Sequence, residues 1–124
     1  RYDVPGSERR RGGFPVKHTR IIQEVAVVSQ LRIYTINKGM MDSYLKLFDE
    51  GIRPIHEKLG IPIEGTWVNA DRSEFIWVRG FASVEEIAAK EDAYFASPER
   101  KALGDLPGSH LAKMEVRVIE SAYP

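Results

Sequence analysis

Cysteine is absent from the 124-residue chain. Disulfide bonds, a thiol nucleophile and thiolate metal sites are therefore excluded. Apolar runs are short, and none approaches the ~20 residues that a membrane-spanning helix needs. The first residues carry no apolar core of a secretory signal, so we expect a cytoplasmic protein that does not insert into a membrane.

The short motifs of common catalytic and cofactor-binding folds are also absent. No GxSxG, P-loop or GxGxxG occurs, so the usual signals for nucleophile-elbow hydrolysis and for nucleotide or dinucleotide sites are lacking. The three histidines, His18, His56 and His110, form no HxH or HxxxH pair. Because a metal site needs several ligands in convergent positions, we expect neither a metal site nor a cofactor.

Charge is unevenly distributed, although the formal net charge is zero. Residues 1–20 hold six Lys and Arg against two acidic residues, so they carry +4 and the remainder carries −4. Residues 1–22 mix Pro, Gly and charge with no apolar period, which predicts a basic arm that is flexible or docks on an acidic surface. The basic cluster lacks interleaved aromatic residues, so we do not expect nucleic acid binding.

Residues 23–124 read as one folded domain. A β-branched strand segment is followed by an amphipathic helix, a strand hairpin around the polar NADRS turn, a second helix opened by the Ser83–Glu86 capping box, and a last alternating strand. This order predicts an α+β, ferredoxin-like βαββαβ fold with a four-stranded antiparallel sheet and both helices on one face. The first helix has apolar positions spaced by 4, 3, 4, 3 and 4 residues, at Met41, Leu45, Phe48, Ile52, Ile55 and Leu59.

Alternation along the strands divides the sheet residues into two sets. One set is wholly aliphatic apart from a methionine, and we expect it to face the helices: Leu31, Ile33, Ile76, Val78, Met114, Val116 and Val118. The other set combines aromatic residues with charges, as protein interfaces do. We therefore predict that it packs on a second copy to form a homodimer: Arg32, Tyr34, Phe75, Trp77, Arg79, Glu115, Arg117 and Ile119.

Several segments resemble the NIPSNAP domain, a branch of the dimeric α+β barrel superfamily. They are "LRIYTINKGMMDSYLKLFDEGIRPIHEKLGIPIEGTW", "EFIWVRGFASVEEIAAKEDAYFASPE" and "KMEVRVIE", in the right order between Leu31 and Glu120. The resemblance implies two ferredoxin-like subunits whose sheets pack face to face, with a small cavity between sheet and helices in each. It carries over no agreed catalytic residue.

His56 is the candidate acid–base group. It lies at the edge of the apolar helix stripe, where one ring nitrogen can face a cavity while the protein holds the other. A hydrogen-bonded structural histidine is the alternative. Pro54 and Gly51 are spaced so that the proline ring disturbs the helix near the glycine, which predicts a local bend that opens space beneath the helix.

Two functions stay open on the sequence. The first is binding of a small, partly apolar molecule between helices and sheet, extended to cofactor-independent conversion if His56 acts as acid or base. The second is a non-catalytic interaction module that uses the dimer surface and the basic arm. For the first function, the residues predicted to shape the ligand site are Tyr34, Tyr44, Trp67, Trp77 and Arg79.

Overall fold

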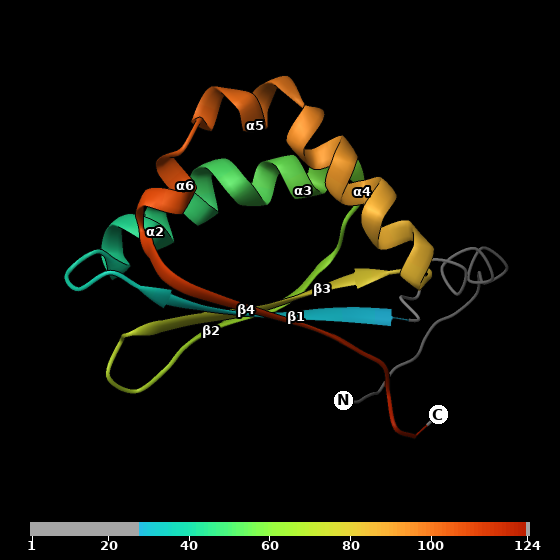
Figure 1. Ribbon diagram of the computed structural model, residues 1–124, viewed down its shortest axis with the longest axis horizontal. Helices are drawn as coiled ribbons and strands as arrows, with labels where there is room; N and C mark the ends of the chain where they lie inside the picture. The colour runs from blue at the N-terminus through green and yellow to red at the C-terminus, as the bar shows by residue number, and fades with distance from the viewer. Residues whose placement is uncertain (1–27, 124) are drawn as a thin grey trace, which may run out of the picture.

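The computed structural model describes residues 28–123. Four antiparallel strands form one sheet in the order β2-β3-β1-β4, and the helices all lie on one face of it (Figure 1). This is the predicted α+β, ferredoxin-like arrangement. The predicted arm, residues 1–22, lies outside the described residues. The strands are β1 (Val28–Ile36), β2 (Ile63–Val68), β3 (Glu74–Phe81) and β4 (Leu111–Ile119).

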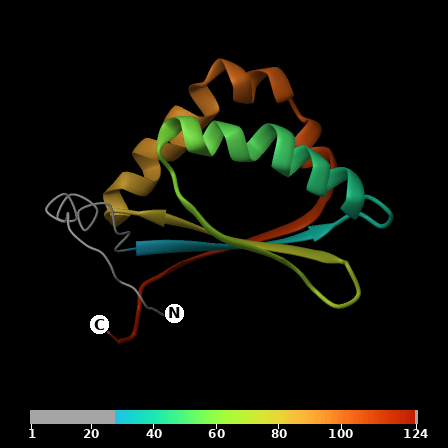
Figure 2. The same ribbon diagram turned by 180° about the vertical axis from the view of Figure 1, so that it is seen from behind.

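The helical layer follows the predicted order, and two short helices lie between the second predicted helix and the last strand. Seen from behind, the helical segment that follows β1 and the one that follows β3 cross the same side of the sheet (Figure 2). Their bounds are α2 (Met41–Leu47), η1 (Phe48–Ile52), α3 (Arg53–Leu59), α4 (Val84–Ala96), α5 (Pro98–Leu103) and α6 (Leu106–Ser109).

The predicted capping box opens α4. Ser83 Oγ accepts a hydrogen bond from the backbone N–H of Glu86 at 3.2 Å, and Glu86 Oε1 accepts one from the N–H of Ala82 at 2.8 Å. Two otherwise unpaired backbone donors are satisfied in this way, which fixes where the helix begins. The following helix, α5, also begins at a serine N-cap, since Ser97 Oγ accepts from the N–H of Arg100, and Pro98 stands in its first turn.

A π-helical segment, η1, separates α2 from α3. The backbone N–H of Arg53 donates to the carbonyl of Phe48, five residues back, which is the wider π-helical hydrogen bond. Pro54 follows directly, so its missing N–H falls where the regular α-helical hydrogen-bond pattern is already interrupted by the wider turn. The distortion that the spacing of Gly51 and Pro54 predicts is thus present, as a widened turn just before the segment that carries His56.

The prediction of which sheet face meets the helices is wrong. Tyr34, Phe75 and Trp77 are buried against the helices, and Arg79 is buried beside them. The aliphatic set of β1 and β3 lies on the outer face instead, half-buried. Alternation separates the residues of the two faces but does not tell which face the helices cover. The aromatic side chains bury more apolar area, which favours packing of their face against the helices. Those outer residues are Leu31, Ile33, Ile76 and Val78.

The phase of β4 relative to β1 is also opposite to the prediction. Val116 lies opposite Arg32, and Met114 opposite Tyr34, so all four side chains share the helix-side face. Glu115 and Arg117 face outward, opposite Ile33 and Leu31. A one-residue change of register exchanges the faces of a whole strand, and the alternation within β4 alone does not fix its register on β1.

Two apolar clusters fill the layer between sheet and helices. The larger contains Tyr34, Phe75 and Trp77, and the smaller contains Val28 and Phe81. Along β1 and β3, polar residues stand between the two clusters. The core is therefore divided by a polar belt, defined here as Gln30, Arg32, His56, Arg79 and Glu91.

Candidate functional site

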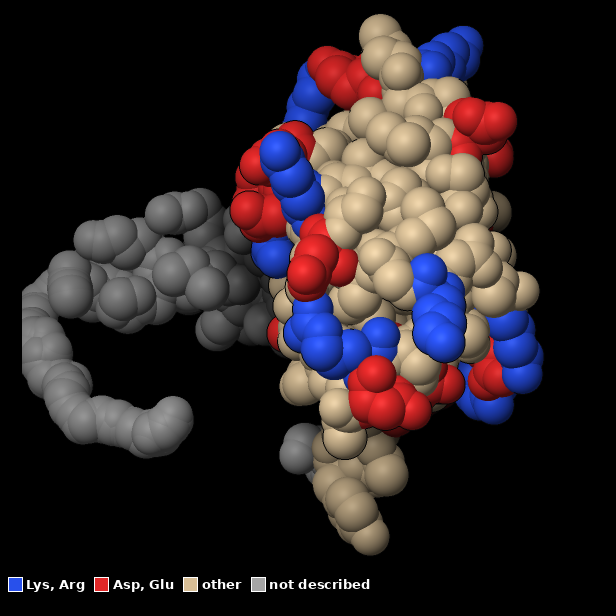
Figure 3. Space-filling view, turned by 90° about the vertical axis from the view of Figure 1, so that its left-hand side faces the viewer, with Lys and Arg blue, Asp and Glu red and all other residues tan. Residues whose placement is uncertain are grey.

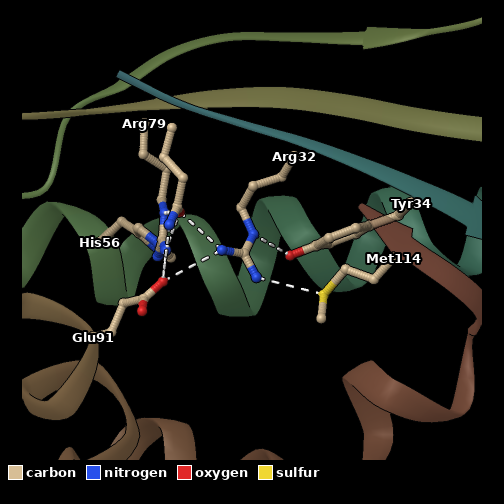
Figure 4. Close-up of polar contacts among 7 residues, drawn as sticks. Arg32, Tyr34, His56, Arg79, Glu91 and Met114 are labelled. Atoms are coloured by element: carbon tan, nitrogen blue, oxygen red, sulfur yellow. Dashed lines mark hydrogen bonds and ion pairs between the residues drawn. The ribbon is translucent and has the colours of Figure 1, made fainter. Parts of the chain in front are cut away.

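The polar belt joins the sheet to two helices. Gln30 and Arg32 come from β1 and Arg79 from β3, while His56 comes from α3 and Glu91 from α4 (Figure 4). The strands present their residues to the helix side by alternation. The π-helical turn before α3 accompanies the burial of both Ile55 and His56 on the underside of that helix.

Arg79 is the centre of the belt. Its Nε donates to Gln30 Oε1 at 3.0 Å, its Nη1 lies 3.0 Å from His56 Nε2, and its Nη2 pairs with Glu91 Oε2 at 2.5 Å. The guanidinium also lies near the rings of Trp77 and Phe81, 5.3 and 5.4 Å from their centroids. Burial lowers the pKa of Arg79, although arginine remains charged in proteins.

His56 is fully buried, and both ring nitrogens have partners. Its Nδ1 lies 2.9 Å from the carbonyl oxygen of Ile52, and its Nε2 faces Arg79. Because arginine can only donate, Nε2 must accept and Nδ1 must carry the proton that is donated to Ile52. Burial, together with the nearby positive charge of Arg79, lowers the pKa of His56 to about 4, and the bond to Ile52 opposes that shift only in part. At neutral pH His56 is therefore an uncharged residue that positions Arg79.

Arg32 is the more accessible cation. Its Nε donates to the hydroxyl of Tyr34 at 2.7 Å, and its Nη1 donates to Gln30 Oε1 at 2.8 Å and reaches Glu91 Oε2 at 3.3 Å. Its Nη2 donates only to the thioether sulfur of Met114 among the described residues, at 3.4 Å (Figure 4). Sulfur is a weak acceptor, so this end of the guanidinium is poorly satisfied.

The charges of the belt do not balance among the described residues. Two guanidinium groups share one carboxylate oxygen, Glu91 Oε2, and His56 is neutral. The cluster therefore carries a net charge of about +1 in a half-buried setting, where charge without a counter-charge is costly. An arrangement of this kind can attract an anion or the negative end of a dipole.

The structure brings four of the six predicted site residues together. Tyr34 and Trp77 contact the belt as aromatic neighbours, with Arg32 lying 5.6 and 5.8 Å from their ring centroids, and His56 and Arg79 are members of it. Tyr44 lies one step away in the aromatic cluster, edge-on to Tyr34, and burial raises its pKa far above the ordinary tyrosine value.

Trp67 does not join these residues. It lies on β2, opposite Ile76 on the outer face of the sheet, and 53% of its surface is exposed. Its ring covers Gly65, where an added Cβ would come within 2.3 Å of the indole. A side chain at position 65 would therefore have to displace this indole. The glycine allows the Trp67 ring to lie flat against the backbone on the outer face of the sheet.

Sequence reasoning did not identify Gln30, Glu91 and Met114 as site residues and assigned Arg32 to an interface. Glu91 had a detectable signal, because it stands at helical spacing between the buried Ile87 and Tyr94 and places a charge in an apolar stripe. Gln30 and Met114 gave no such signal, since their roles depend on the register of three strands.

A second histidine pairs with a serine at the other end of the helical layer. His110 is buried, and its Nε2 lies 2.8 Å from Ser43 Oγ while its Nδ1 lies 2.9 Å from the carbonyl oxygen of Leu106. These contacts tie the start of β4 to α2 and α6. Within residues 28–123, no group of three or more His, Asp or Glu residues is arranged to hold a metal ion.

A pocket of about 370 Å³ lies where the β1–α2 loop meets the β2–β3 turn, and His56 is not among its lining residues. Its lining includes the cations Lys38 and Arg72 and the anions Asp42 and Asp71. Figure 3, which views this end of the molecule, shows both signs of charge side by side along the edge of a broad uncharged area. The pocket therefore offers no preference for a ligand of either charge.

The family model for NIPSNAP matches residues 29–122. A NIPSNAP family protein of Agrobacterium tumefaciens is similar in structure, with a TM-score of 0.72 and 25% identity over 78% of this chain and 95% of that one. An uncharacterized NIPSNAP domain protein of Burkholderia xenovorans gives 0.69 and 17% over 78% and 97%. A putative antibiotic biosynthesis monooxygenase of Nitrosomonas europaea gives 0.59 and 8% over 77% and 99%.

No curated protein matches the chain. The family match nonetheless runs from the second residue of β1 past the end of β4, and it includes each residue of the polar belt. The chain therefore belongs to the NIPSNAP family.

Proposed function

We propose that the protein binds a small, partly apolar molecule between the sheet and the helices, at Arg32 and beside β4. The observation that carries this proposal is the pairing of Arg32 Nη2 with the thioether of Met114. A strong donor that finds only a weak acceptor is a place where a polar ligand atom gains a hydrogen bond.

The surroundings of Arg32 fit an amphipathic ligand. Met114 and Val116 lie on the same face of the sheet as Arg32, and 52% and 40% of their surfaces are exposed. Tyr34 and Trp77 supply aromatic area next to the guanidinium. Apolar walls with a few convergent polar groups are typical of small-molecule sites. The name of the Nitrosomonas europaea structure, a putative antibiotic biosynthesis monooxygenase, agrees with small-molecule chemistry on this fold.

Conversion of the ligand by His56 sets a further requirement. Nε2 is the ring nitrogen that could accept a proton, and its lone pair already accepts a hydrogen bond from Arg79. An acid–base role therefore needs Arg79 to move away on ligand binding. The lowered pKa keeps Nε2 unprotonated at neutral pH, as a base must be, but it also makes the imidazole a weak base. Binding is thus the primary function that we propose, and cofactor-independent catalysis is an extension of it.

A screen of small-molecule fragments by protein-observed NMR tests the binding proposal. The indole N–H signal of Trp77 and the methyl signal of Met114 report on the site, and the indole N–H of Trp67, on the outer face, serves as an internal control. We expect fragments that shift Trp77 and Met114 while leaving Trp67 in place. A diverse library in which no fragment shifts the two reporters would refute the proposed function.

We also propose a homodimer that buries the outer face of the sheet. In both ribbon views no helix of the described residues covers this face (Figures 1 and 2). The face bears aliphatic side chains and the exposed ring of Trp67. Apolar patches of this kind mark interaction surfaces. Ile119 belongs to the interface set predicted from the sequence, and the other residues of the patch do not: Leu31, Ile33, Trp67, Ile76, Val78 and Ile119.

The alternative function, a non-catalytic interaction module, would use this same outer face together with the basic arm. The arm, residues 1–22, lies outside the described residues, so that part of the alternative remains a prediction from charge alone. A cytoplasmic location is likewise a prediction. In residues 28–123 no helix has the length and apolar character to cross a membrane.

A further inference from the structure

We propose that the ligand of this site is a carboxylate with an apolar body, and that its carboxylate binds Arg32 through Nη2. This inference rests on the proposed binding site and adds the chemical class of its ligand. It follows from three features of the described residues: the unbalanced charge of the polar belt, the difference between its two arginines, and the apolar side chains around the poorly satisfied one.

The net positive charge of the polar belt favours binding of an anion. Glu91 is the one carboxylate among the described residues that pairs with either arginine, and the same oxygen, Oε2, serves both. His56 adds no negative charge and stays neutral because its Nε2 accepts from Arg79. A carboxylate from the ligand would bring the cluster to neutrality, and charge-assisted hydrogen bonds to a guanidinium are among the stronger contacts available to it.

Arg32, and not Arg79, has a donor to offer. Arg79 uses Nε, Nη1 and Nη2 on Gln30, His56 and Glu91, and only 4% of its side chain is exposed. The Arg32 side chain is 13% exposed, and its Nη2 donates to sulfur. Replacing a thioether by a carboxylate oxygen exchanges a weak acceptor for a strong one at little cost, because methionine is unbranched and easily changes rotamer.

The neighbours of Arg32 define the rest of the ligand. Val116 lies directly opposite Arg32 on β4, and Met114 lies two residues further along, at the next position on the same face, so both flank the guanidinium with exposed apolar surface. Trp77 lies below it, and the buried Nε1 of this indole has no hydrogen-bond partner among the described residues. An apolar group attached to the carboxylate would cover the exposed side chains of Met114 and Val116, while the buried Trp77 supports the guanidinium from beneath.

A matched pair of ligands tests the class. 3-Phenylpropionate and 3-phenylpropionamide have nearly the same size and shape and differ in charge. Both are titrated into the full chain while the Trp77 indole N–H and the Met114 methyl signals are recorded. We expect the carboxylate to bind at least about tenfold more tightly than the amide, the ratio typical of a hydrogen bond to a charged group.

Variants then assign the preference to Arg32. In Arg32→Gln the ratio should fall close to one, whereas Arg117→Gln, which removes an exposed arginine of the outer face, should preserve it. Arg32→Lys keeps the charge and should retain part of the preference, which makes the test independent of whether Arg32→Gln folds. Circular dichroism establishes that each variant is folded.

Each contrary outcome has a separate meaning. An amide that binds as tightly as the acid to the wild type overturns the carboxylate class, and a preference that persists in folded Arg32→Gln overturns the role of Arg32. If neither compound shifts the reporters while neutral or cationic fragments from the screen do, the carboxylate class is wrong and the proposed binding function stands. If no fragment of any charge shifts them, both fail.

Discussion

Arg79 Nη1 lies 3.0 Å from His56 Nε2, and this contact fixes which ring nitrogen carries the proton and adds to the effect of burial in keeping the histidine neutral. A guanidinium cannot accept a proton, so a charged imidazole at this position would place two positive groups face to face with no acceptor between them. The neutral ring is held by Ile52 on its other side. The residue that the sequence nominates as an acid–base group is therefore, in this conformation, the support of a buried arginine.

The stability of the protein should depend on His56 as the pH falls. Folded His56 has a pKa of about 4, against an ordinary value of 6.5 in the unfolded chain. Its contribution is fully present above pH 6.5 and is lost as the pH falls from 6.5 toward 4, because only the unfolded chain takes up the proton in that interval. Between pH 7.5 and pH 5 this amounts to about 2 kcal/mol of unfolding free energy.

The matched variant is His56→Gln, whose amide oxygen can still accept from Arg79 but cannot titrate. Urea unfolding of both proteins at pH 7.5, 6 and 5 should give a shallower pH dependence for the variant, while all other titrating groups contribute equally. Parallel curves for the two proteins would show that His56 is not buried as a neutral ring.

Glu91→Gln should destabilise the fold, because it leaves Arg32 and Arg79 without their shared carboxylate. Removing one partner of a buried ion pair costs roughly 3 kcal/mol, and the 30% exposure of the Glu91 side chain reduces the expected loss to about 1–2 kcal/mol. Asp92→Asn, one residue further along α4 and exposed, is the control and should change the unfolding free energy by less than about 0.5 kcal/mol. Equal losses in the two variants would mean that the Glu91 pairs contribute nothing.

The features that the sequence predicts correctly are those set by local chemistry. The capping box at Ser83, the order of strands and helices, and the helix distortion near Gly51 each depend on residues within one or two turns of each other. The face of the sheet that meets the helices could not be read from the sequence, because both sets of alternating residues are apolar enough to be buried. Arg32 and Arg79 appeared too charged for an interior.

The missing information was the partner of each charge. Arg79 is tolerated inside because Gln30, His56 and Glu91, which lie 49, 23 and 12 residues away, converge on it. Such convergence depends on strand register and on the placement of α4 over the sheet, neither of which follows from periodicity. The sequence therefore indicates candidate residues by their chemical type, whereas the hydrogen bonds and ion pairs that give them a role depend on the three-dimensional fold.

Pro54→Ala should change stability little. In a regular helix interior a proline costs roughly 3 kcal/mol, but here the π-helical segment just before Pro54 already interrupts the regular hydrogen-bond pattern. We expect the unfolding free energy to change by less than about 1 kcal/mol. Glu57→Pro, which places a proline in the interior of the same helix at an exposed position, should lose about 3 kcal/mol or more. A large gain in Pro54→Ala would instead show that Pro54 strains the helix.

The last prediction concerns the outer face of the sheet. Ile33 lies at its centre, on β1 between β3 and β4, opposite Ile76 on one side and Glu115 on the other. If two copies bury this face, Ile33→Glu would place a carboxylate from each copy inside an apolar interface, which costs several kcal/mol and should separate the subunits. We expect sedimentation velocity at micromolar concentration to give a dimer for the wild type and a folded monomer for Ile33→Glu. Val118→Glu adds the same charge to an exposed position on the opposite face of the sheet and should remain dimeric. A monomeric wild type, or an Ile33→Glu variant that stays dimeric, would show that this face is not the dimer interface.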